Sequence, residues 1–227
     1  MLGQIQMMVR RLVLGLVVML AAMQLGLAQQ DTQEQVREQL GLINVEVVKL
    51  YRQGKYAAAL ALAKSAVELS ERGLGAEHLD TGANLNNLAL LHKTMGAYDK
   101  ALPLYQRALA IAEQARGPEH PATGTNLNNL AALHYSMGAY DKALPLFQRA
   151  LAIAEKAQGP EHPDTGTSLN NLAELYRAMG AYDKALPLYQ RALVIAEKAL
   201  GPVHPDTGTH LNNLAELYRT TGTYDKT

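Results

Sequence analysis

The chain has 227 residues, no cysteine, and equal numbers of basic and acidic side chains, 21 of each. Without cysteine it has no disulfides, no thiolate metal ligands and no thiol nucleophile. The balance of charge argues against a nucleic-acid-binding protein, which normally carries a basic excess.

The first 28 residues differ from the rest of the chain. Arg10 and Arg11 precede an apolar run from Leu12 to Leu27, and the small residues Gly26 and Ala28 stand at its end. This layout predicts a secretory signal peptide over 1–28. An uncleaved membrane anchor is the alternative, but the run is shorter than the ~20 residues that a spanning helix needs. We therefore expect an exported protein, periplasmic or secreted and of bacterial origin, with no membrane attachment after cleavage.

A polar segment rich in glutamine follows at 29–41 and runs into the first predicted helix. From Val36 the apolar residues have helical spacing, and a second helix begins near Tyr56. These two helices form a divergent first repeat over 42–82, as expected for the end of a repeat array, where one face has no neighbour. The apolar stripe of the first helix comprises Val36, Leu40, Ile43, Val47 and Leu50.

Three near-identical units follow, with a period of 42 residues that is marked by Gly96, Gly138 and Gly180. A fixed period of this length is typical of a helical repeat array. Each unit contains two amphipathic helices with a glycine between them, and a Gly-Pro pair ends the second helix. We place full repeats at 83–124, 125–166 and 167–208 and a half repeat at 209–227.

The order of small and aromatic residues, with Ala173, Tyr176, Ala185 and Tyr189 as an example, resembles the tetratricopeptide repeat. The 42-residue length and the Gly-Pro-x-His-Pro-Asp-Thr connector are similar to those of the kinesin light chain type. The resemblance covers roughly residues 31–227. It implies an all-α fold, a right-handed superhelical α-solenoid of helix–turn–helix repeats.

The half repeat ends before its second helix. We expect its helix to leave an apolar face, with Leu211, Leu214 and Tyr218, that its own repeat does not cover. Two interpretations are open. The chain is a truncated product, or it self-associates through this uncapped C-terminal face.

No motif predicts catalysis. One histidine per repeat precedes the first helix, and a 42-residue spacing spreads such residues along an edge instead of gathering them around a metal. The recurring Tyr-Asp-Lys is interpreted as a helix start, because aspartate is favourable in the first turn. We therefore predict a protein that is not an enzyme and has no cofactor or metal. The histidines are His78, His120, His162 and His204.

In tetratricopeptide arrays, the first helices line a concave groove that receives extended peptides. The matching positions here carry an asparagine in every repeat, whose amide suits a peptide backbone, and several cations that would attract acidic residues. The alternative is that these asparagines, and those that follow them at 87, 129, 171 and 213, form hydrogen-bonded ladders between repeats. The predicted groove residues are Asn86, Lys93, Asn128, Tyr135, Asn170, Glu174, Arg177, Asn212, Glu216 and Arg219.

Two functions are compatible with this interpretation. The first is a non-catalytic scaffold that binds a peptide or protein partner in the groove. The second is the recognition arm of a larger enzyme or effector, for example one with a caspase-like protease domain beyond residue 227.

Overall fold

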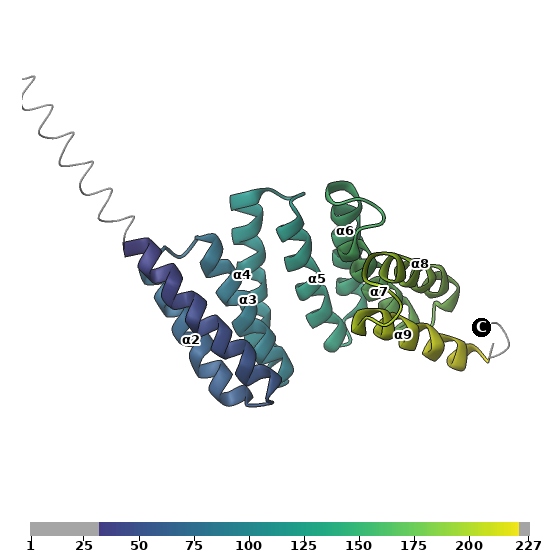
Figure 1. Ribbon diagram of the computed structural model, residues 1–227, viewed down its shortest axis with the longest axis horizontal. Coiled ribbons are helices and arrows are strands. Elements are labelled where there is room, and N and C mark those ends of the chain that lie inside the picture. Colours follow the sequence, from purple (N-terminus) through teal and green to yellow (C-terminus); the bar gives the residue numbers. More distant parts are fainter. Residues whose placement is uncertain (1–31, 223–227) are drawn as a thin grey trace, which may run out of the picture. The chain divides into compact units, whose positions relative to one another are not determined.

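The computed structural model describes residues 32–222, and it divides the chain into two compact units, Met1–Ala76 and Glu77–Thr227. The predicted signal peptide at 1–28 lies outside the described residues. Within 32–222 every regular element is a helix (Figure 1). No helix in this part of the chain is both long enough and apolar enough to cross a membrane.

The first unit is a pair of helices. Residues 32–52 are helical, so the helix includes most of the polar segment at 29–41, and α2 spans Tyr56–Gly73. Val36 and Leu40 from the first helix pack against Ala66 of α2. The stripe that the sequence predicted therefore forms the core of this pair.

The second unit consists of helix pairs in chain order followed by a single last helix, and consecutive helices within the unit contact each other (Figure 1). The first helices of the repeats are α3 (Leu79–Thr94), α5 (Pro121–Ser136), α7 (Pro163–Ala178) and α9 (Pro205–Thr221). The second helices are α4 (Tyr98–Arg116), α6 (Tyr140–Ala157) and α8 (Tyr182–Leu200). The repeat starts placed at 83, 125, 167 and 209 therefore lie about one turn inside the first helices. Each of these second helices continues through its proline.

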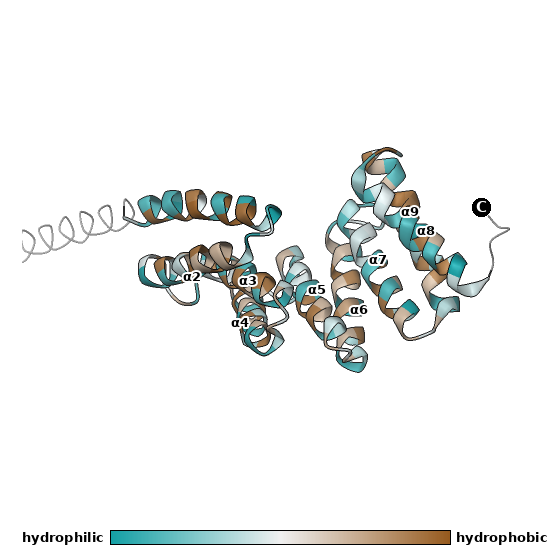
Figure 2. Cartoon of the chain, turned by 90° about the horizontal axis from the view of Figure 1, so that it is seen from below, coloured by the Kyte–Doolittle hydropathy of each residue, from teal (hydrophilic) through white to brown (hydrophobic). Residues whose placement is uncertain are grey.

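The core is built from small and aromatic residues of one repeat and leucines of the next. Ala131, Ala143 and Phe147 of one repeat pack with Leu172 and Leu175 of the following first helix. All five are nearly inaccessible to solvent. Each helix carries both apolar and polar residues along its length (Figure 2). Because three such clusters in the second unit each include buried residues of two repeats, burial couples neighbouring repeats within this unit.

The connectors between repeats are fixed by three local devices. Gly117 ends α4 with φ of 95°, a conformation that glycine adopts at little cost. The His120 side chain caps α5 by accepting a hydrogen bond from the backbone N–H of Ala122 at 3.1 Å. The buried Thr123 donates its hydroxyl proton to the Gly117 carbonyl at 2.8 Å. The histidines that the sequence placed at helix starts are N-caps in all four first helices of this unit.

Arginines on the second helices connect consecutive repeats on another surface. Arg149 on α6 pairs with Glu113 on α4 at 2.8 Å and donates to the Pro118 carbonyl at 3.0 Å. One repeat later, Arg191 makes the same contacts with Glu155, at 2.6 Å, and with the Pro160 carbonyl, at 3.1 Å. These contacts recur with the sequence period.

The α9 helix packs on the preceding repeat. Leu217 is almost completely buried, and Leu214 packs beside it against the cluster that contains Tyr189. Leu211 remains 43% exposed. Part of the apolar face expected at the half repeat is therefore covered by the preceding repeat.

Candidate functional site

The candidate site is the row of side chains on the four first helices of the second unit, here called the first-helix row. It has three positions per helix, separated by four and three residues, and consecutive first helices contact each other directly. The row includes every groove residue predicted from the sequence, with Leu90 and Ala132 at the remaining positions. In chain order it comprises Asn86, Leu90 and Lys93; Asn128, Ala132 and Tyr135; Asn170, Glu174 and Arg177; and Asn212, Glu216 and Arg219.

The asparagines of the row bond to the next first helix. Asn86 donates to the side chain of Asn126 and accepts from Asn129 at 3.4 Å. Asn128 donates to the hydroxyl of Ser168 at 3.0 Å. These side chains therefore form a ladder between repeats, which was the alternative interpretation of the sequence. A contact between them and a peptide stays a prediction.

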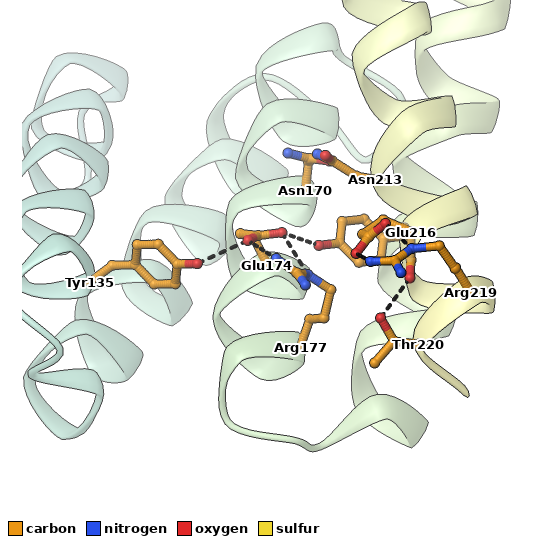
Figure 3. Close-up of polar contacts among 9 residues, drawn as sticks. Tyr135, Asn170, Glu174, Arg177, Asn213, Glu216, Arg219 and Thr220 are labelled. Atoms are coloured by element: carbon orange, nitrogen blue, oxygen red, sulfur yellow. Dashed lines mark hydrogen bonds and ion pairs between the residues drawn. The ribbon is translucent and has the colours of Figure 1, made fainter. Parts of the chain in front are cut away.

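The ladder continues from α7 to α9. The Asn170 carbonyl oxygen accepts from Asn213 at 3.0 Å (Figure 3). The same oxygen lies 3.0 Å from Nδ1 of His210. Burial lowers the pKa of His210, against a smaller opposing effect of Asp206. Because a carbonyl oxygen only accepts, Nδ1 carries the proton in this contact. Asn212 itself lies exposed on α9.

The centre of the row is the Glu174 carboxylate, which receives hydrogen bonds from three helices (Figure 3). Arg177 on the same helix binds it through two nitrogens at 2.5 and 3.1 Å. The hydroxyl of Tyr135 on α5 donates to it at 2.9 Å, and that of Tyr189 on α8 donates at 2.6 Å. The cluster therefore fixes α5, α7 and α8 relative to one another.

The cluster shifts the pKa values of its members. Burial alone would raise the pKa of Glu174, but the hydrogen bonds from Arg177, Tyr189 and Tyr135 outweigh it and hold that pKa below 4.5. Burial, followed by the bond to Glu174, raises the pKa of Tyr135 to about 12 and also raises that of Tyr189. The bond to Glu174 raises the pKa of Arg177. The arrangement therefore favours an ionised carboxylate with protonated donors around it.

The cations of the row differ in their partners. Arg177 is paired with Glu174, and Arg219 pairs with Glu216 at an exposed site through bonds that include one of 2.7 Å. Lys93 is half-buried, and burial lowers its pKa. Within residues 32–222 it has no carboxylate partner. The cationic line expected from the sequence is thus neutralised at α7 and α9 but not at α3.

The residues that sequence reasoning missed lie in other repeats or on the second helices. Tyr189, Ser168 and His210 complete the contacts of row residues, yet nothing in their own repeat marks them. Ser168 and His210 lie 40 residues after Asn128 and Asn170, so a comparison between repeats at that spacing would have found them. Tyr189 lies 15 residues after Glu174, on the second helix of the same repeat.

The recurring Tyr-Asp-Lys, which the sequence analysis interpreted as a helix start and not as a catalytic motif, lies at the starts of the second helices. Tyr98, Tyr140 and Tyr182 begin α4, α6 and α8, each followed by aspartate in the first turn, as the sequence indicated. In the described part of the chain, no three histidine, aspartate or glutamate residues are grouped so that they could hold a metal ion.

Comparison with known proteins identifies the class. The family model for the tetratricopeptide repeat matches residues 49–114, 83–156, 127–198 and 164–226. The chain belongs to the tetratricopeptide repeat family, and its fold is an all-α helical repeat solenoid. No curated protein matches its sequence.

Solved structures place it close to kinesin light chain-like proteins within this family. A Podosopora anserina kinesin light chain with nearly identical TPR-like repeats has 25% identity and a TM-score of 0.68, over 86% of this chain and 90% of that one. BtubC (BKLC) from P. vanneervenii has 24% identity and a TM-score of 0.71, over 88% and 84%. A Rap protein, crystallised in complex with competence and sporulation factor, has 18% identity and a TM-score of 0.67, over 80% and 48%.

Proposed function

We propose that this chain is a non-catalytic scaffold that binds an extended peptide segment of a partner protein along the first-helix row. The tetratricopeptide repeat fold is typical of protein–protein interaction scaffolds. The observation that supports the proposal most directly is the continuity of the row. Hydrogen bonds between first helices run from Asn86 on α3 to Asn213 on α9 and hold the row in one arrangement.

A preformed polar surface favours binding of an extended chain. Each residue that is already ordered reduces the conformational entropy lost on association. The half-buried Tyr135 and the exposed Leu90 offer apolar area between the polar groups, and mixed surfaces of this kind suit a peptide with alternating side chains. That a Rap protein of the same fold has been crystallised in complex with competence and sporulation factor agrees with this use of the fold.

The experiment is a selection of displayed peptides, each about 12 residues long, on the purified chain, followed by amide hydrogen exchange with and without a selected peptide. We expect slower exchange on α3, α5, α7 and α9 and little change on α4, α6 and α8. Ala132→Arg, which adds bulk in the middle of the row, should weaken binding at least tenfold, whereas Glu197→Gln on the exposed surface of α8 should not. Protection confined to the second helices, or no selected peptide, would contradict the proposal.

We also propose that the protein acts outside the cytoplasm, because of the signal-peptide layout at 1–28. The expected result is a mature protein that begins at Gln29 when the chain is expressed in a bacterium, measured by intact mass and by fractionation. An intact N-terminus in the membrane fraction would favour the anchor instead.

A further inference from the structure

We propose that the peptide carries an acidic side chain whose carboxylate docks against Lys93, at the junction between α3 and α5. This inference rests on the proposed function and specifies the partner: an extended segment with Asp or Glu, held at the N-terminal end of the first-helix row.

The third full repeat shows which positions of the row bind a carboxylate. Glu174 is bound from two directions along the row: by Arg177, three residues later on its own helix, and by Tyr135, 39 residues earlier on the preceding first helix. A residue at the third position of the row thus has two carboxylate sites within reach. One is the middle position of its own helix, and the other is the middle position of the next first helix.

Lys93 occupies the third position on α3, equivalent to Tyr135 and Arg177. Both carboxylate sites within its reach are apolar, because the middle positions are Leu90 on its own helix and Ala132 on α5. The repeats that follow have Glu174 and Glu216 at these positions. The α3–α5 junction therefore has a cationic side chain, Lys93, but no glutamate at either middle position to pair with it.

The state of Lys93 favours an anionic ligand. A half-buried ammonium has lost part of its hydration, and in the described part of the chain no carboxylate compensates for this loss. A ligand carboxylate would compensate for it and form a charge-assisted hydrogen bond. Leu90 is 39% exposed beside it, so an apolar residue next to the acidic one would also find a contact.

The rest of the row gives no comparable site. The guanidinium of Arg177 already has the bidentate partner Glu174, and that of Arg219 has Glu216. A peptide carboxylate at α7 or α9 would meet a carboxylate that is already bound. Charge complementarity therefore places the acidic residue of the peptide at α3 and α5.

The test uses peptides from the selection described above, synthesised in pairs that differ only by Glu→Gln at the acidic position and measured by fluorescence anisotropy. We expect the Glu peptide to bind about tenfold more tightly, and Lys93→Gln to abolish this difference while Lys93→Arg retains it. Ala132→Glu should also abolish the difference, because it supplies within the chain the carboxylate that Glu174 supplies in the third repeat. The matched control is Ala152→Glu, which adds the same charge at an exposed position of α6 and should leave the difference unchanged.

The outcomes separate the two proposals. Peptides that bind the first helices but show equal affinity for Glu and Gln would overturn this inference and leave the scaffold function intact. A Glu preference that survives in Lys93→Gln would also overturn it, since the carboxylate would then lie elsewhere. Absence of any peptide binding would overturn both. Circular dichroism of each variant confirms that the helices are retained.

Discussion

At the scale of the residue, Glu174 has the largest number of partners in the first-helix row. Its carboxylate accepts from Arg177, Tyr135 and Tyr189, and each donor comes from a different helix. A half-buried carboxylate is tolerable only because these donors replace water. Removal of its charge should therefore affect stability as well as the shape of the row.

We expect Glu174→Gln to lower the free energy of unfolding at pH 7 by about 1 kcal/mol, a hydrogen-bond contribution discounted for partial solvent exposure. The folded-state pKa of Glu174 lies below its ordinary value of 4.5. Its contribution is thus fully present above that value and is lost as the pH falls through the folded-state pKa. Urea unfolding at several pH values should show the difference between wild type and variant shrinking below pH 4.5.

The control for this experiment is Glu216→Gln. Glu216 makes the equivalent pair with Arg219, but the pair is exposed to solvent, where ion pairs stabilise little. Its effect should be smaller than that of Glu174→Gln. Equal effects of the two variants would show that the tyrosine donors contribute nothing.

At the scale of the element, the start of each first helix in the second unit depends on a histidine that acts as a hydrogen-bond acceptor. We expect His120→Ala to destabilise the protein by about 1 kcal/mol, the usual cost of losing an N-cap. His120→Asn should retain most of the stability, since asparagine caps well. His120 is the cleanest site, because the capped residue is Ala122 and no aspartate lies there. Chemical denaturation measures both, and equal losses for the two variants would contradict a capping role.

Each first helix of the second unit also contains a glycine near its start, and in all of them except α9 this glycine lies against an isoleucine of the second helix. A Cβ on Gly124 would lie 3.2 Å from Cγ2 of Ile153, whereas a Cβ on Gly208 would meet no atom of the described chain within 4 Å. Alanine favours a helix over glycine by roughly 0.5–1 kcal/mol. We therefore expect Gly208→Ala to stabilise the protein by about that amount and Gly124→Ala to stabilise it less or to destabilise it. Thermal unfolding decides, and an equal gain at both sites would exclude close packing at Gly124.

Much of this level of organisation was predictable from the sequence. Apolar spacing, the connector glycines and the His-Pro pairs gave the helices and their order, because these signals act within about one turn of the chain. The role of Gly124 was not predictable, since nothing local separates a packing glycine from a helix-ending one. The partners of Asn128 and Glu174 were not predictable either, because they depend on which turns of two separate helices lie opposite each other.

At the scale of the whole molecule, stability depends on contacts between neighbouring repeats. Leu175 on α7 packs into the cluster of Ala143 and Phe147 in the preceding repeat. We expect Leu175→Ala to lower the free energy of unfolding by about 2–5 kcal/mol through the cavity it leaves. The urea transition should also broaden, because a weakened interface lets the two sides unfold separately.

Leu211→Ala is the comparison for this prediction. Leu211 is 43% exposed, so its truncation removes little burial and should leave the transition nearly unchanged. Circular dichroism and amide exchange on both variants measure the effect. A sharp, single transition in Leu175→Ala would indicate that coupling between the repeats does not depend on this cluster.

Because the connectors between repeats are alike, the chain can gain or lose whole repeats during evolution. His120 and His162 precede the same kind of helix, and Glu113 and Glu155 face arginines at the same spacing. An in-frame deletion of codons 121–162 would join His120 to Pro163 and bring Arg191 opposite Glu113, so the histidine cap and the arginine–glutamate pair would be restored at the new junction. Unequal recombination between the coding units of these repeats can thus add or remove 42 residues at a time while the connector contacts are kept.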